Sequence, residues 1–175
     1  MTVVLLRGVN VGGHRRLRPS ALANALAHLD VVSIGAAGTF VVRRPVDQAE
    51  LRAEFARQLP FDARLMICNG SEVTKLLAHD FYAHHVDRPD IVRFVSLLSE
   101  APHDPPVVPM DLPASGEWLV RILAREGRFV IGLHRRQMRA IGQLGALDRV
   151  FAAPGAIRNW TTFQAIGRVL GGERR

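Results

Sequence analysis

The stretch TVVLLRGVNVGG, residues 2–13, decides how the chain begins to fold. It opens with a run of β-branched and leucine side chains, which is typical of a strand that is buried on both faces. Two adjacent glycines, Gly12 and Gly13, close the stretch and favour a tight connection to the next element. We therefore predict a central strand that ends in a glycine-rich loop.

The segments that follow complete a first α+β half. Residues 18–29 and 46–59 carry apolar side chains at helical spacing, and Asp47 stands where a helix N-cap is expected. Residues 31–44 hold two apolar runs around a glycine-containing turn, which indicates a hairpin, and residues 63–69 indicate another strand. This order predicts a ferredoxin-like split β-α-β arrangement, with an antiparallel sheet and both helices on one face.

The remaining residues predict a second, smaller α+β half, whose similar style of elements suggests a degenerate duplication of the first. We expect the ferredoxin-like half over residues 1–70 and the second half over residues 71–175. The C-terminal helix is expected to pack back, so that both halves can form one integrated domain. The second half is expected to contain a helix at 71–81 capped by Ser71, a strand at 90–99, a proline-rich connector at 100–116, a hairpin at 117–135, a helix at 136–151, a break at 153–155 and a final helix at 160–170.

Composition indicates a folded cytoplasmic protein. Hydrophobic residues make up 48% of the 175 residues and charged residues 22%, the balance of a globular chain. The single cysteine, Cys68, cannot form an internal disulfide, which favours a reducing compartment. The first apolar stretch ends early, at Arg7, and no run approaches the roughly 20 apolar residues of a membrane span. We therefore expect neither secretion nor membrane insertion.

The charge balance permits an anionic partner. Lys and Arg number 23 against 16 Asp and Glu, so the formal net charge is +7. Nearly all of the positive charge is arginine, which grips phosphate and carboxylate groups through two parallel hydrogen bonds. The abundance of arginine and alanine also fits a GC-rich coding bias, so support for nucleic acid as the partner is weak.

The opening stretch has the features of an anion-binding loop. Glycines reach the backbone conformations in which N–H groups converge on an anion, as Gly12 and Gly13 can do here. Arg7 and Asn10 shortly precede this pair, and a helix is expected to follow. The alternative is a simple strand-to-helix connection with its arginines in solvent.

A second group of polar residues stands near the C-terminus, in RNWTTF, residues 158–163. Arg158 and Asn159 precede Trp160, and a guanidinium beside an indole can be held rigidly for a ligand. The alternative, which we favour for these residues taken alone, is a structural plug in which Trp160 fills the core and Arg158 bonds loop carbonyls. Convergence of Arg7 and Arg158 would favour a shared binding site.

The segments LLRGVNVGG (5–13) and RNWTTF (158–163) resemble the hallmark ends of the bacterial domain-of-unknown-function family 1697. That family typically opens with Arg-Gly-Ile-Asn-Val-Gly-Gly and closes with Thr-Arg-Asn-Trp-Asn-Thr. It usually carries Tyr-Ile-Gln-Ser-Gly-Asn before its hairpin, where this chain has Ala36 and Ala37 in place of the Gln and the Ser. A polar residue before the closing segment is likewise Ala156. The resemblance implies a fold without an established activity.

Other signals of chemistry are weak. The segment HDFYAHHVDRPD, residues 79–90, is rich in His and Asp, but its spacing does not match a helical zinc site, so we assign no metal and no cofactor. Cys68 is expected to act as a small buried hydrophobe. No nucleophile elbow or acid–base pair stands out, so catalytic residues stay unassigned and a non-enzymatic role is favoured.

These observations lead to one principal hypothesis. We expect a cytoplasmic protein that binds a small anionic ligand bearing phosphate or carboxylate. The alternatives are an enzyme acting on a phosphorylated metabolite and a nonspecific nucleic-acid binder, which would show a steep dependence on salt. The oligomeric state is left open. The residues expected to hold the ligand are Arg7, Asn10, Gly12, Gly13, Arg158 and Asn159.

Overall fold

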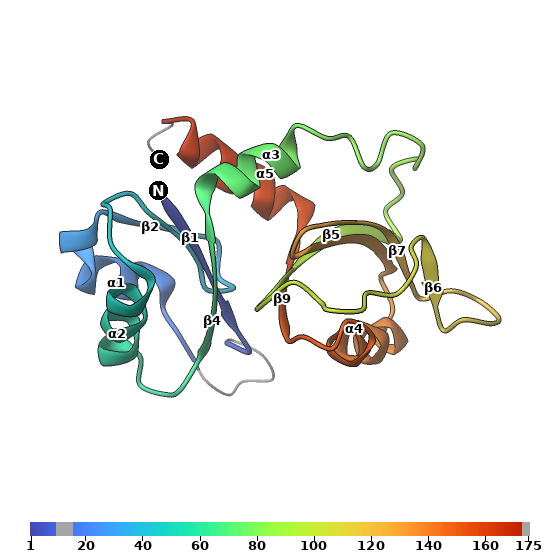
Figure 1. Ribbon diagram of the computed structural model, residues 1–175, viewed down its shortest axis with the longest axis horizontal. Coiled ribbons are helices and arrows are strands. Elements are labelled where there is room, and N and C mark those ends of the chain that lie inside the picture. Colours follow the sequence, from blue (N-terminus) through green and yellow to red (C-terminus); the bar gives the residue numbers. More distant parts are fainter. Residues whose placement is uncertain (10–15, 173–175) are drawn as a thin grey trace. The chain divides into compact units, whose positions relative to one another are not determined.

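The structure is a computed structural model that describes residues 1–9 and 16–172. The chain forms two compact units (Figure 1). The first consists of Met1–Ala78 together with Thr161–Arg175, and the second of His79–Trp160. The boundary that we predict after residue 70 stays a prediction, because compactness alone does not measure which part of a chain folds by itself.

The first unit is built on a four-stranded antiparallel sheet. Its order is β2-β3-β1-β4, so the stretch that opens the chain forms a central strand, as predicted. The order of strands and helices is also the predicted one, whereas the finer assignment to the ferredoxin-like fold stays a prediction. The elements are β1 (Thr2–Arg7), α1 (Pro19–Ala25), β2 (Val31–Ile34), β3 (Thr39–Val42), α2 (Gln48–Gln58) and β4 (Arg64–Asn69).

Helices α1 and α2 cover the same face of this sheet (Figure 1). Alternate residues of β1, Val4 and Leu6, point to this face, because successive side chains of a strand point to opposite sides. They join Leu22 of α1 and Phe55 of α2 in one buried core. The ring of Phe55 meets that of Phe40 edge to face, with centroids 5.4 Å apart. The core therefore fixes which side chains of β1 face away from the helices.

The ends of the helices differ in part from the predicted ones. Helix α1 ends at Ala25, and a short 3₁₀ turn covers Ala27–Leu29, so the apolar stripe of the predicted helix is divided between two elements. Helix α2 begins after Asp47, whose carboxylate accepts hydrogen bonds from two backbone N–H groups at 2.8 and 2.9 Å. The predicted N-cap of α2 is thus confirmed.

Two further helices complete the first unit, α3 (Gly70–Leu77) and α5 (Trp160–Leu170), which lie side by side. A Cβ on Gly167 of α5 would come within 2.5 Å of Leu77 on α3, so glycine allows the close approach. The predicted cap of α3 was wrong. The helix begins directly after Asn69, whose backbone N–H donates to Glu72 at 2.8 Å, so Ser71 lies inside the first turn.

The second unit is built on a five-stranded antiparallel sheet of order β6-β7-β8-β5-β9. One helix, α4 (Met138–Val150), packs Leu147 against Phe94, Val120 and Val130 on one face of this sheet. Its element order differs from that of the first unit, so the suggested duplication stays a prediction. The strands are β5 (Ile91–Leu98), β6 (Met110–Leu112), β7 (Val120–Glu126), β8 (Phe129–Arg135) and β9 (Gly155–Asn159).

Two strands of the second sheet depart from the sequence prediction. β6 lies inside the predicted proline-rich connector, and its three residues between prolines give no periodic signal. β9 begins at Gly155, where we predict a break. Gly155 is needed there because a Cβ would come within 2.4 Å of the Ser96 hydroxyl on β5. The glycine that reads as a break therefore serves close strand pairing.

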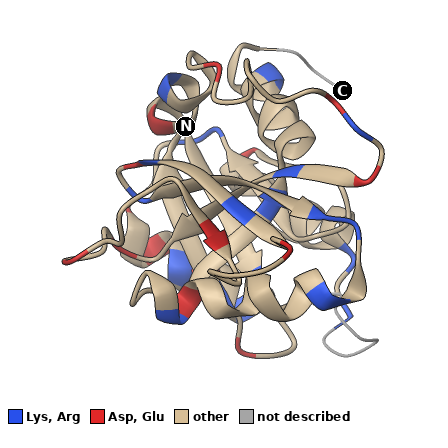
Figure 2. Ribbon diagram, turned by 90° about the vertical axis from the view of Figure 1, so that its right-hand side faces the viewer, with Lys and Arg blue, Asp and Glu red and all other residues tan. Residues whose placement is uncertain are grey.

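Within the described residues, the chain is an α+β protein with two antiparallel sheets, which is the predicted fold class. Its basic residues are spread over strands, helices and loops rather than gathered on one element (Figure 2). In the part of the chain that the structure describes, no helix is both long enough and apolar enough to cross a membrane.

Candidate anion-binding site

Two arginines lie next to each other where β1 ends and β4 begins. Arg7 is the last residue of β1 and pairs in register with Arg64, the first residue of β4. Because Leu6 and Leu65 belong to the core under the helices, strand alternation places both arginines on the other face of the sheet. Arg64 is exposed, whereas Arg7 is half-buried and its Nη1 atom is shielded from solvent. Two guanidinium groups thus leave neighbouring strands on the same side.

The turn between β2 and β3 packs against this end of β1. Gly38 has a φ of 70°, and its carbonyl oxygen accepts a hydrogen bond from the backbone N–H of Leu6 at 2.7 Å. A Cβ on Gly38 would lie 2.8 Å from Cγ2 of Val9 and 2.9 Å from Cβ of Leu6. Ala36 and Ala37 therefore stand in a turn beside the residues that lead to and follow Arg7. The family's usual Gln and Ser would occupy the same place.

The loop expected to cradle an anion falls outside the described residues, and this applies to Asn10, Gly12 and Gly13. On its far side, Arg16 and Arg18 are both exposed before α1 begins. The described part of the chain thus places exposed arginines after this loop, and before it Arg7, which pairs with Arg64 of the neighbouring strand.

Arg158 lies in the second unit, on β9, where it pairs with Val95 of β5. It is only 8% exposed, and burial lowers the pKa of its guanidinium to about 10. Its Nη1 donates to the carbonyl oxygen of Ile157 at 2.8 Å, a backbone contact of the kind expected for a structural role. Ile157 packs on the α4 side of the sheet, so Arg158 points to the opposite face.

The neighbours of Arg158 point elsewhere. Asn159 is exposed and pairs with Phe94, and strand alternation directs its side chain to the face opposite that of Arg158. Trp160 is half-buried, and its ring meets that of Tyr82 edge to face at 5.2 Å. Arg7 belongs to the first unit and Arg158 to the second, and their sharing of one ligand stays a prediction.

Sequence reasoning missed Arg64. Its strand was predicted, and a basic residue at the start of that strand was visible. What was lacking was the register that places it opposite Arg7, because pairing between strands distant in sequence leaves no local pattern.

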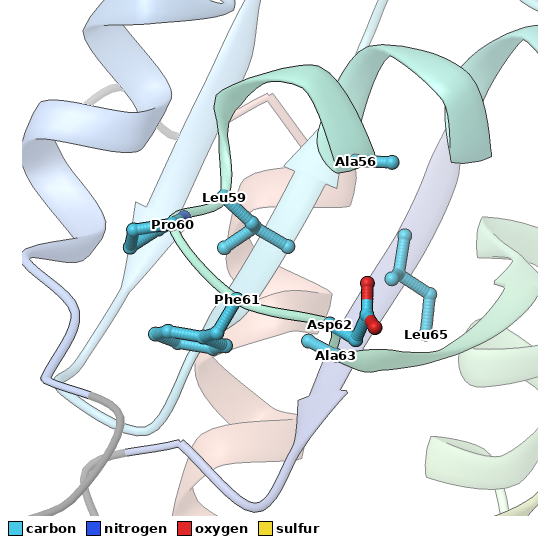
Figure 3. A pocket seen from close by; sticks show the side chains of 7 residues that line it. All are labelled: Ala56, Leu59, Pro60, Phe61, Asp62, Ala63 and Leu65. Carbon is cyan, nitrogen blue, oxygen red and sulfur yellow. The ribbon is translucent and has the colours of Figure 1, made fainter.

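A cavity of about 380 Å³ lies in the first unit between the end of α2 and β4 (Figure 3). Leu59, Phe61 and Leu65 contribute apolar walls, and the charged lining residue is Asp62. Leu65 places this cavity on the helix side of the sheet, away from Arg7 and Arg64. The carboxylate of Asp62 would repel an anion, so the cavity does not suit the expected ligand.

Two comparisons with known proteins found similarities to this chain. A family model described as a protein of unknown function, DUF1697, matches residues 1–123. The conserved bacterial protein SP0830 from Streptococcus pneumoniae has a similar structure, with a TM-score of 0.62 and 17% sequence identity over 97% of each chain. That likeness shows a shared fold. A search of the curated proteins found no match. From the match over the first 123 residues, the chain belongs to the DUF1697 family.

Proposed function

We propose that the chain binds a small anionic ligand, bearing phosphate or carboxylate, at the end of β1. The observation that carries this proposal is the in-register pairing of Arg7 with Arg64. Like charges directly opposite each other on antiparallel strands repel and destabilise the pair. An oxyanion between the guanidinium groups replaces this repulsion with charge-assisted hydrogen bonds, which are stronger than hydrogen bonds between neutral groups.

The surrounding residues support an anion rather than a neutral ligand. Arg16 and Arg18 add exposed positive charge close by in sequence. Asn10, Gly12 and Gly13 would contribute an amide group and backbone N–H groups to the same ligand, as the sequence suggests. The planar fork of arginine matches the oxygens of phosphate and carboxylate, so both ligand classes fit this site.

Thermal unfolding in rising concentrations of inorganic phosphate tests the proposal. A ligand that binds only the folded state stabilises it, by about 2.7 kcal/mol at about 100 times the Kd. Potassium chloride at equal ionic strength separates binding from general screening of charge. We expect phosphate to raise the Tm of the wild type above the chloride control, and the Arg64→Gln variant to lose that rise.

Arg168→Gln is the matched control. Arg168 is exposed on α5 of the same unit, so this variant loses the same charge without touching the arginine pair. It should keep the full response to phosphate. A wild type that responds to phosphate no more than to chloride, or equal losses in both variants, would contradict the proposal. Binding of random duplex DNA that weakens steeply with salt and equally in both variants would instead favour nonspecific nucleic-acid binding.

A further inference from the structure

A second cavity, of about 590 Å³, lies in the second unit beside the edge strand β6. Its size falls in the range typical of small-molecule sites, about 300–1,000 Å³. Asp111 of β6 and Arg121 of β7 line it together with Leu123 and Ala114. It belongs to neither of the two groups of residues that sequence reasoning singled out for a ligand.

A rigid ion pair lines the cavity. Arg121 donates from Nε and Nη2 to the two carboxylate oxygens of Asp111, at 2.7 and 2.8 Å. The guanidinium also lies over the ring of Trp118, 4.7 Å from its centroid, and Arg135 lies 4.6 Å from the same centroid. Trp118 itself does not line the cavity. The flat guanidinium is therefore held in place before any ligand arrives.

This ion pair also sets the charge of the cavity. Arg121 and Asp111 neutralise each other, so the cavity offers a free anion little net attraction. Each carboxylate oxygen has a second lone pair, which can accept a further hydrogen bond. The wall thus presents a flat cationic surface next to an acceptor, within a neutral pair.

The other walls are fixed as well. The pairing of β7 with β8 shifts between Ile122 and Ala124, so Leu123 is the extra residue of a β-bulge and lines the cavity. On the other side, the cavity is lined by His85, whose backbone carbonyl accepts a hydrogen bond from Arg93 at 3.0 Å. Both walls are thus tied to strands of the second unit's sheet.

We propose that this cavity binds an uncharged, flat heteroaromatic ring with an N–H donor, the class that includes the nucleobases. The ring stacks on the guanidinium of Arg121, since arginine stacks on aromatic faces. Its edge N–H donates to Asp111. Leu123 supplies apolar surface beside the ring.

Inosine, which is uncharged and carries a ring N–H, is the probe. The chain has two tryptophans, so Trp160→Phe leaves Trp118, whose ring contacts Arg121, as the reporter. We expect inosine to change the fluorescence of Trp118 in a saturable manner, with 1-methylinosine binding about tenfold more weakly because it lacks the N–H. Inorganic phosphate should neither cause the change nor compete with inosine, which separates this site from the one at the end of β1.

Three variants complete the test in the same background. Ala114 lines the cavity and is exposed, so Ala114→Phe should fill the space and abolish binding without touching the ion pair. Arg121→Lys should weaken inosine about tenfold, because lysine lacks the flat fork. Arg125→Lys is the control, since this half-buried side chain donates to the Gly127 carbonyl outside the cavity, and it should bind as the parent does. No saturable response up to about 10 mM inosine, or unchanged binding by Ala114→Phe, overturns the proposal.

Discussion

The hydroxyl of Tyr82 donates a hydrogen bond to the backbone carbonyl of Phe94 at 2.9 Å and thereby ties the segment before β5 to the middle of that strand. Tyr82 is 4% exposed, and Arg93 lies over its ring at 5.2 Å from the centroid. Together with the Arg93–His85 bond, it anchors the segment that carries His85, a wall of the cavity in the second unit.

Tyr82→Phe should therefore lower the free energy of unfolding by about 1–2 kcal/mol, because it removes the hydroxyl partner of a buried carbonyl and keeps the ring. Denaturant unfolding of both proteins measures this difference. Equal midpoints and slopes for the two proteins would show that the bond contributes nothing to stability.

The same hydroxyl makes stability depend on alkaline pH. Burial raises the pKa of Tyr82 above its ordinary value, so above about pH 10 the unfolded chain releases this proton while the folded chain keeps it. The free energy of unfolding should then fall as pH rises above that value, by up to about 1.4 kcal/mol for each pH unit. The Tyr82→Phe variant should lack this fall in stability. Arg158, whose pKa is lowered by burial, is present in both proteins, so its effect on the pH dependence cancels in the comparison.

Tyr82 is the one tyrosine of the chain, so tyrosinate absorbance reports its ionisation directly. Appearance of that absorbance near pH 10, before unfolding, would count against the predicted rise in pKa.

The start of α3 offers a test of its cap. Glu72→Ala should destabilise the chain by about 1 kcal/mol, since it removes the acceptor of the Asn69 N–H and an acidic group near the helix N-terminus. Ser71→Ala is the matched control and should change the free energy of unfolding by no more than a few tenths of a kcal/mol. The reverse order of effects in thermal unfolding would restore Ser71 as the cap.

Two glycines of the β2–β3 turn, Gly35 and Gly38, allow a test of packing beside Arg7. Gly38→Ala should cost about 2 kcal/mol or more, because its methyl group would press on Leu6 and Val9 at a positive φ. Gly35→Ala also has a positive φ but meets nothing within 4 Å, so it should cost only about 1 kcal/mol. Chemical unfolding gives both values. A similar loss in the two variants would mean that backbone strain alone, and not the contact with β1, explains the glycine at position 38.

The elements with a full local pattern were predictable from the sequence. The run after Met1 gives β1, and Asp47 followed by apolar residues at helical spacing gives α2. Two strands of the second sheet were not predictable. β6 is three residues long, and the glycine that begins β9 has the same local appearance as a break.

In the candidate site, one arginine was recognisable from its local sequence, whereas the other required the pairing of distant strands. Arg7 follows a buried strand and was recognisable as a basic group at its end. Arg64 became part of the site only through strand register, which depends on the packing of whole faces. The opposite directions of Arg158 and Asn159 follow from β9, so a missed strand also hid the separation of two adjacent side chains.

The first unit takes its residues from both ends of the chain, since α5 packs beside α3 after the whole of the second unit has been traversed. On a ribosome, the N-terminal sheet therefore emerges long before the helix that completes its unit. The second unit is continuous in sequence and can finish folding first. Nascent chains that stop before Thr161 would carry both Arg7 and Arg64 and yet lack α5, which completes the unit around them.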